Sequence, residues 1–302
     1  MKKPEPAWYE LGWPREVSPE AIEQAIRLLA TMAGNPVVLE AVGMTGGAKH
    51  RLALPSGDAS GLARQLRVAV PGLAVEKVDE RPPLQADRAI EVRLTTRNRS
   101  LFTAEVAYVS RALLTALSGL RAGEVLSLTW TLGHQLRPLA VPNRATAPAS
   151  GSWLKDVVAT LVRGHLALDG ESRSALRDKQ AVPGWRAAGR IGVAGGDAPR
   201  EHQLVRQVLG ALRATEAPGL AYWVRSTKAG PVADAQVPRR LPLRLNVHEL
   251  GAVSSWPVGA TAELPVAKQQ PAAGALPAHP QRGTCHRGGD LPGPRTPAGH
   301  LG

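Results

Sequence analysis

The sequence predicts a mixed α/β fold, with a ferredoxin-like split βαβ unit, a second, less complete α/β unit and a disordered tail. Apolar residues recur at helical spacing in some segments and alternate as in strands in others. Between residues 50 and 132 these segments follow the order strand, helix, strand, strand, helix, strand, which is the split βαβ order. The last residues, 261–302, lose this periodicity and consist mainly of Pro, Gly, Ala, Gln, Arg and His.

The first predicted helix begins after Ser18. Serine is a good N-cap, Pro19 is tolerated in the first turn, and Glu20 suits the positive end of the helix dipole. The helix continues with apolar residues at helical spacing: Ile22, Ile26, Leu29 and Met32.

The rest of the first unit follows from the same patterns. Its predicted elements are strands 37–42 and 50–54, a helix carrying Leu62, Leu66 and Val70 on one face, strands 73–78 and 89–95, a helix over 104–120 and a strand over 124–132. We expect four of the apolar helix residues to face a sheet: Leu62, Leu66, Val109 and Leu113.

Composition divides the chain into five segments. They are an N-terminal extension (1–17), a ferredoxin-like domain (18–136), a linker rich in Pro, Ala, Ser and Gly (137–152), a second α/β domain (153–259) and a disordered tail (260–302). In the second domain the sequence predicts helix 153–162, strand 189–193, helix 199–214 and strand 220–224. The two domains are too dissimilar in sequence to predict a repeat.

Charge and cysteine content limit the possible partners and the compartment. The 37 Lys and Arg residues exceed the 25 Asp and Glu residues, and the net charge of +12 favours anionic partners such as nucleic acid or an acidic membrane surface. Cys285 is the single cysteine, so no intrachain disulfide is possible and a cytoplasmic location is expected. No stretch contains the roughly 18 apolar residues that a membrane-spanning helix needs.

The glycine-rich segments do not form a recognisable catalytic or cofactor site. Gly43–His50 lacks the Gly-Lys-Ser/Thr ending of a phosphate-binding loop and lies between two predicted strands, so a hairpin turn is expected. Gly192–Gly196 follows a strand but lacks the dinucleotide-binding glycine pattern. The histidines show no metal-ligand spacing and are expected at the surface. We therefore predict no catalytic residue, no cofactor and no metal site.

Two groups of arginines are the candidate binding residues. The first surrounds a predicted strand end and the second lies beside two leucines: Arg93, Arg97 and Arg99, then Arg239, Arg240 and Arg244. Arginine binds phosphate through two parallel hydrogen bonds, so either group could contact a nucleic-acid backbone. An ordinary solvated surface is the alternative, because no aromatic platform accompanies these residues in the sequence.

Several phrases of the sequence resemble one protein family. They are Trp13-Pro14-Arg15 before Ser18-Pro19-Glu20, Pro36-Val37-Val38-Leu39-Glu40-Ala41, Leu62-Ala63-Arg64-Gln65-Leu66-Arg67, Leu245-Asn246-Val247-His248-Glu249-Leu250 and Trp256-Pro257-Val258-Gly259. Over residues 8–259 the chain resembles the actinobacterial ATP-binding proteins of the type IV secretion, conjugative DNA-transfer class, relatives of FtsK-like motors. The resemblance implies an accessory region ahead of the motor, peripheral to a membrane secretion complex, with DNA or other transfer components as partners.

The continuation that this resemblance implies can be encoded in a shifted reading frame. The family continues with a stretch like R-V-I-G-E-A-T-Y-P-G and then R-P-L-A-I. Permitted codons for Thr284–Gly293 give R-V-I-G-E-A-T-Y-P one base later, and those for Thr296–Leu301 give R-P-L-A-I. We expect the frame to change between about Gly259 and Lys268, which would make 260–302 an out-of-frame tail and leave the Walker A motor outside this chain.

Two functional hypotheses remain from the sequence. The first is a non-catalytic accessory region of a DNA-transfer ATPase, truncated before its motor. Hydrolysis needs a phosphate cradle, a lysine and magnesium ligands together, and this set is not recognisable in the sequence. The alternative is a stand-alone basic α/β module that binds nucleic acid.

Overall fold

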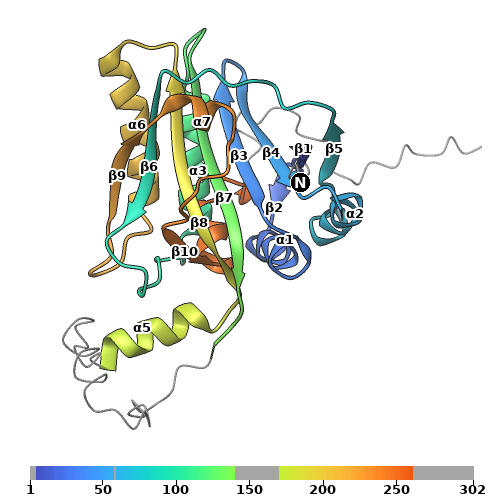
Figure 1. The fold of residues 1–302 in the computed structure, drawn as a ribbon, viewed down its shortest axis with the longest axis vertical. Helices are drawn as coiled ribbons and strands as arrows, with labels where there is room; N and C mark the ends of the chain where they lie inside the picture. The colour runs from blue at the N-terminus through green and yellow to red at the C-terminus, as the bar shows by residue number, and fades with distance from the viewer. Residues whose placement is uncertain (1–4, 58, 140–169, 261–302) are drawn as a thin grey trace, which may run out of the picture. The chain divides into compact units, whose positions relative to one another are not determined.

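The computed structural model describes residues 5–57, 59–139 and 170–260, all within one compact unit of residues 1–272 (Figure 1). The predicted helix 153–162, most of the predicted linker and the predicted out-of-frame tail lie outside the described residues. Among the described residues, no helix is both long and apolar enough to cross a membrane.

The structure confirms the mixed α/β fold. Its described helices are α1 (Pro19–Met32), α2 (Ala59–Ala69), α3 (Val106–Ser118), α5 (Gly170–Gln180), α6 (Ala198–Arg213), α7 (Ala229–Ala233) and α8 (Val247–Val253). Its described strands are β1 (Ala7–Gly12), β2 (Glu16–Val17), β3 (Val37–Met44), β4 (Gly47–Leu54), β5 (Ala74–Val78), β6 (Arg88–Leu94), β7 (Val125–Leu136), β8 (Gly184–Ala194), β9 (Tyr222–Thr227), β10 (Leu243–Asn246) and β11 (Gly259–Ala260).

Local signals placed most of these elements correctly. The Ser18 side chain accepts a hydrogen bond from the backbone N–H of Ala21, as expected of an N-cap. The glycine-rich segment is a hairpin turn between β3 and β4, in which Gly46 has a φ of 98°. The four helix residues expected to face a sheet are buried: Leu62, Leu66, Val109 and Leu113.

The main sheet consists of two βαββαβ units joined edge to edge. Its strand order is β5-β1-β4-β3-β7-β8-β6-β9, with β10 pairing beside β8. The first unit runs from β1 to β5 and the second from β6 to β9. In each unit the first strand lies between the third and the fourth strands, and the second strand lies on the other side of the third. The two second strands, β3 and β7, pair antiparallel and join the units.

This arrangement corrects the predicted domains. The ferredoxin-like unit was predicted to begin at β4, but β1, inside the expected N-terminal extension 1–17, is an interior strand between β4 and β5. The predicted domains 18–136 and 153–259 share one sheet, because β8 pairs with both β7 and β6. The second unit is also complete rather than partial. Sequence periodicity reveals a strand but not its partner, so the grouping of strands was wrong although most strands were right.

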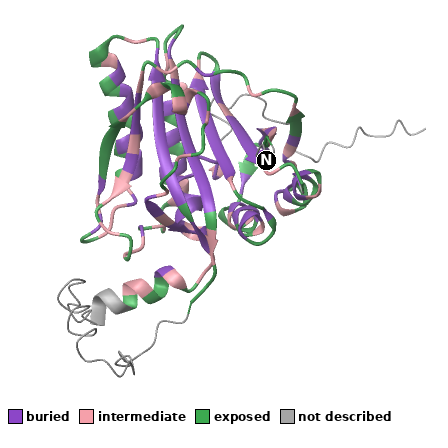
Figure 2. Ribbon diagram, viewed as in Figure 1, coloured by how far each residue is buried: buried purple, intermediate pink, exposed green. Residues whose placement is uncertain are grey.

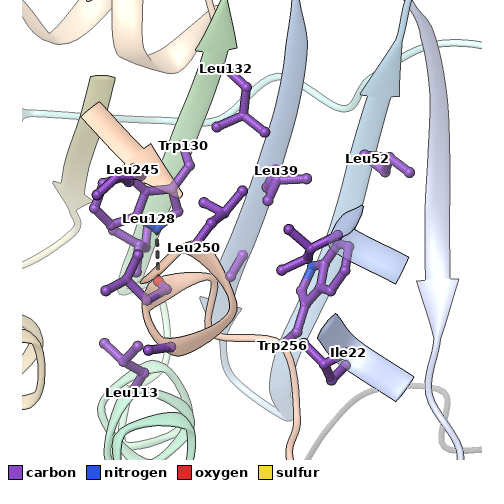
Figure 3. Packing of buried hydrophobic residues seen from close by; sticks show 14 of the residues in the cluster. Ile22, Leu39, Leu52, Leu113, Leu128, Trp130, Leu132, Leu245, Leu250 and Trp256 are labelled. Carbon is purple, nitrogen blue, oxygen red and sulfur yellow. Dashed lines mark hydrogen bonds between the residues drawn. The ribbon is translucent and has the colours of Figure 1, made fainter. Parts of the chain in front are cut away.

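Helices cover one face of this sheet. Each helix contacts the next in the order α2, α1, α8, α3 and α6. The short helix α8 therefore lies between the helix pairs of the two units (Figure 1). The central strands carry the most continuous burial, whereas the edge strand β9 is largely exposed (Figure 2). Trp130 of β7 donates a hydrogen bond from its indole nitrogen to the Val253 carbonyl of α8 at 2.9 Å, beside Leu250 and Leu128 (Figure 3). The core therefore extends across both units.

Candidate nucleic-acid interface

The sheet face opposite these helices carries one row of polar residues across both units. The strand register places them side by side: Glu76, Glu10, Arg51, Glu40, Thr129, Arg190, Glu91 and Arg225. Glu40 is buried and pairs with Arg51 at 3.3 Å and with Arg81 at 2.7 Å. These partners compensate the buried carboxylate, as a low-dielectric environment requires.

Two loops close the middle of this face. Arg81, from the loop between β5 and β6, reaches Glu40 and also donates to the Ala233 carbonyl of α7. Arg190 donates from Nη1 to the Gln236 carbonyl, in the loop between α7 and β10, at 2.8 Å. Among the described residues, these contacts occupy the centre of the polar face and leave its ends uncovered.

Arg93 and Arg97 of the first predicted group lie at the same end of the sheet as the second group, where β6 and β7 end and β8 begins. Figure 1 shows these strand ends. Arg93 and Arg97 line the same pocket as Pro242, which lies two residues after Arg240. Arg97, Arg239 and Arg240 are exposed, whereas Arg244 is half-buried. Residues far apart in the sequence thus form one basic surface.

Two further arginines extend this surface. Arg186 of β8 lies directly opposite Arg244 of β10 in the strand register. Arg137, just after β7, lines two pockets with Arg244, one of which also includes His134. We call the following residues the arginine cluster: Arg97, Arg137, Arg186, Arg239, Arg240 and Arg244.

Two of the predicted residues have structural partners instead. Arg99 donates from Nη1 to the Pro218 carbonyl at 2.8 Å, and its own carbonyl accepts a hydrogen bond from Lys179. Arg93 pairs with Glu91 at 2.6 Å and lies over the Trp223 ring. Arg99 therefore lies outside the arginine cluster, and Arg93 lies at its border.

Little negative charge offsets the arginine cluster. Segments 94–99, 134–139, 184–190 and 236–244, which supply it, contain no Asp or Glu. Within the described part of the chain, no carboxylate forms a salt bridge with a member of the cluster. Burial and the neighbouring charge of Arg186 lower the pKa of Arg244, while Glu249 partly opposes them. Like charges directly opposite in a sheet destabilise it, and a bound anion would relieve this repulsion.

A buried ion pair anchors α5 beside the arginine cluster. Lys179 Nζ lies 2.8 Å from Glu249 Oε1 and 2.9 Å from the Arg99 carbonyl oxygen. The same carboxylate accepts the backbone N–H groups of Leu101 and Asn246. Every oxygen of this buried carboxylate thus has a partner, and the pair fixes the end of α5 to α8 and to the loop after β6.

Sequence reasoning missed three residues of this region: Arg137, Arg186 and Trp223. Arg186 belongs to β8, which the sequence predicted to begin only at residue 189. Trp223 lies in the predicted strand 220–224, but its exposure follows from β9 being an edge strand. Arg186 and Trp223 are placed by pairing with distant strands, and Arg137 by its position directly after β7. Periodicity within one segment reveals neither kind of placement.

The histidines were expected at the surface, and the structure confirms this for some of them but not for His50. His134 and His202 are exposed, as expected, whereas His50 is buried, with Nε2 2.9 Å from the Ser255 carbonyl oxygen. Its position on the helix-covered face of β4 was not read from the sequence, since the strand was predicted to start at this residue. Across residues 5–57, 59–139 and 170–260, no group of His, Cys, Asp or Glu side chains could hold a metal ion.

No protein-family model matches the chain, and no curated protein sequence matches it.

Proposed function

We propose that this chain is a non-catalytic accessory module of a DNA-transfer ATPase and that its arginine cluster binds the nucleic-acid backbone. The observation that supports binding is the convergence of arginines from four separate segments onto one end of the sheet. The sequence resemblance supports the assignment to a DNA-transfer system.

Phosphate is the anion that this surface suits best. Guanidinium groups form paired hydrogen bonds with phosphate oxygens. Several arginines spaced along one surface can contact successive phosphates of one nucleic-acid strand. The opposed pair Arg186 and Arg244 offers positive charge from two adjacent strands. A backbone-binding surface of this kind recognises charge rather than sequence.

The test is binding of the purified protein to fluorescently labelled mixed-sequence DNA at several salt concentrations. We expect affinity to fall steeply with salt, because each phosphate contact releases counterions. The double variant Arg239→Ala/Arg240→Ala should bind more weakly and show a shallower salt dependence.

The matched control removes the same charge elsewhere. Arg64 on α2 and Arg206 on α6 are exposed on the helix-covered side. The variant Arg64→Ala/Arg206→Ala should bind DNA nearly as well as the parent. Equal losses in both double variants, or no DNA binding at low salt, would refute the proposal.

A further inference from the structure

A polar pocket of about 410 Å³ lies at the border of the arginine cluster. Trp223 and Pro242 contribute apolar surface, and the polar side chains that line it are Arg93, Thr95, Thr96, Arg97 and Asn98. It lies outside the centre of the sheet face that the loops close. A pocket with one aromatic wall, amide and guanidinium donors and basic neighbours suits a ligand that is flat, polar and attached to phosphate.

Trp223 is the unusual residue of this pocket. Its side chain is 47% exposed, whereas Trp13, Trp130, Trp185 and Trp256 are buried to 2% exposure or less. An exposed indole leaves apolar surface in water, and tryptophan is enriched at contact surfaces for this reason.

Neighbouring residues also hold Trp223 in place. It lies on β9, the edge strand of the sheet, opposite Arg93 in the register with β6. The Arg93 guanidinium lies 6.0 Å from the ring centre and is held by Glu91 at 2.6 Å. Arg225 is exposed on the same face of β9, two residues further along. A rigid strand thus presents the indole between arginines.

We infer that Trp223 is a stacking platform for an unpaired base and that the preferred ligand of this surface is single-stranded nucleic acid. This inference rests on the proposed function, since the arginine cluster would hold the phosphates on either side of the stacked base. Stacking on an aromatic side chain requires a base whose face is free, which a duplex does not offer except at its ends. Asn98 lines the same pocket, and its amide can both donate to and accept from a base edge.

The test compares single-stranded oligo(dT) with a blunt duplex of mixed sequence, both fluorescently labelled, in anisotropy titrations. Trp223→Ala should weaken oligo(dT) binding roughly ten-fold, the loss expected for one base–aromatic stack, and should leave duplex binding nearly unchanged. Trp223→Phe should retain most of the affinity because it keeps an aromatic face. Tyr108→Ala removes a 61% exposed aromatic residue from α3 and should have no effect.

The outcomes separate the two proposals. If the parent protein binds DNA in a salt-dependent way but Trp223→Ala binds oligo(dT) as well as the parent does, the stacking inference is wrong and the proposed function stands. The same holds if Trp223→Ala loses oligo(dT) and duplex binding equally. If the parent protein binds neither DNA at low salt, both proposals fail. An unchanged melting temperature of Trp223→Ala is the control for folding, as expected for an exposed side chain.

Discussion

His50 shows how the fold restricts the ionisation of one residue. Its ring is fully buried, contacts the edge of Trp13 and lies within hydrogen-bonding distance of the Ser255 carbonyl oxygen. Burial lowers the pKa of His50 to about 4, although the hydrogen bond to Ser255 partly opposes this shift. The folded protein therefore holds this imidazole neutral in a range where an unfolded chain would protonate it.

We predict an acid-dependent loss of stability from this residue. The pKa of His50 in the folded protein, about 4, is below the ordinary value of 6.5, so its stabilising contribution is complete above pH 6.5 and is lost as the pH falls towards 4. Between pH 7 and pH 5 the free energy of unfolding should fall by about 2 kcal/mol from this group. Urea denaturation at both pH values measures it. His50→Gln should show a smaller difference, and an unchanged difference would contradict the prediction.

Arg186 is expected to cost stability while supporting binding. It faces Arg244 across the strand pair, and removing one of two opposed like charges relieves a repulsion of about 0.2–1 kcal/mol. Arg186→Ala should therefore have an equal or slightly higher melting temperature and a weaker affinity for DNA. Thermal unfolding and DNA titration of the same sample measure both effects. A clear loss of stability would show that the arginine has a structural role instead.

At the scale of the elements, α5 depends on Lys179 for its anchorage. Lys179→Met should lower the free energy of unfolding by about 3 kcal/mol, because it leaves the buried Glu249 carboxylate without its ionic partner. Urea denaturation at neutral pH measures this loss. Lys228→Met, which changes an exposed lysine, is the matched control and should have little effect. Similar stabilities of the two variants would show that the pair contributes little.

The helices and hairpins were predictable from the sequence because their signals are local. The Ser18 cap and the spacing of Leu62 and Leu66 define their helices within a few residues of chain. The order of strands was not predictable in the same way. β1 reads as a short segment near the N-terminus, and only its pairing with β4 and β5 makes it an interior strand.

The candidate site was predictable only in part for the same reason. Arg97, Arg239, Arg240 and Arg244 were identified as basic residues, but nothing within either segment indicates that they meet. Their meeting depends on the pairing of β10 with β8 and on the path of the loop that ends at Pro242. Trp223 was not recognised, because its exposure depends on β9 being an edge strand.

At the scale of the whole molecule, the two βαββαβ units should unfold together. They share the strand pair β3–β7, where Leu128 lies opposite Ala41, and α8 contacts helices of both units. Leu128→Ala should lower stability by roughly 2–5 kcal/mol while leaving one cooperative transition. Urea denaturation followed by circular dichroism and by tryptophan fluorescence tests this. Two separate transitions, with only one shifted, would show independent domains.

The position of α8 has a consequence for the synthesis of the protein. This helix and the turn after it lie near the C-terminal end of the described chain, yet their carbonyls receive hydrogen bonds from Trp130, Ser110 and His50. Beyond them β11 pairs with β2, which lies near the N-terminal end of the described residues. A chain emerging from the ribosome exposes its N-terminal segments first, so α1 and α3 remain uncovered until residues 247–260 follow. Residues 247–260 must therefore be synthesised before either unit gains its full core, and until then the nascent chain would be most exposed to chaperones and proteases.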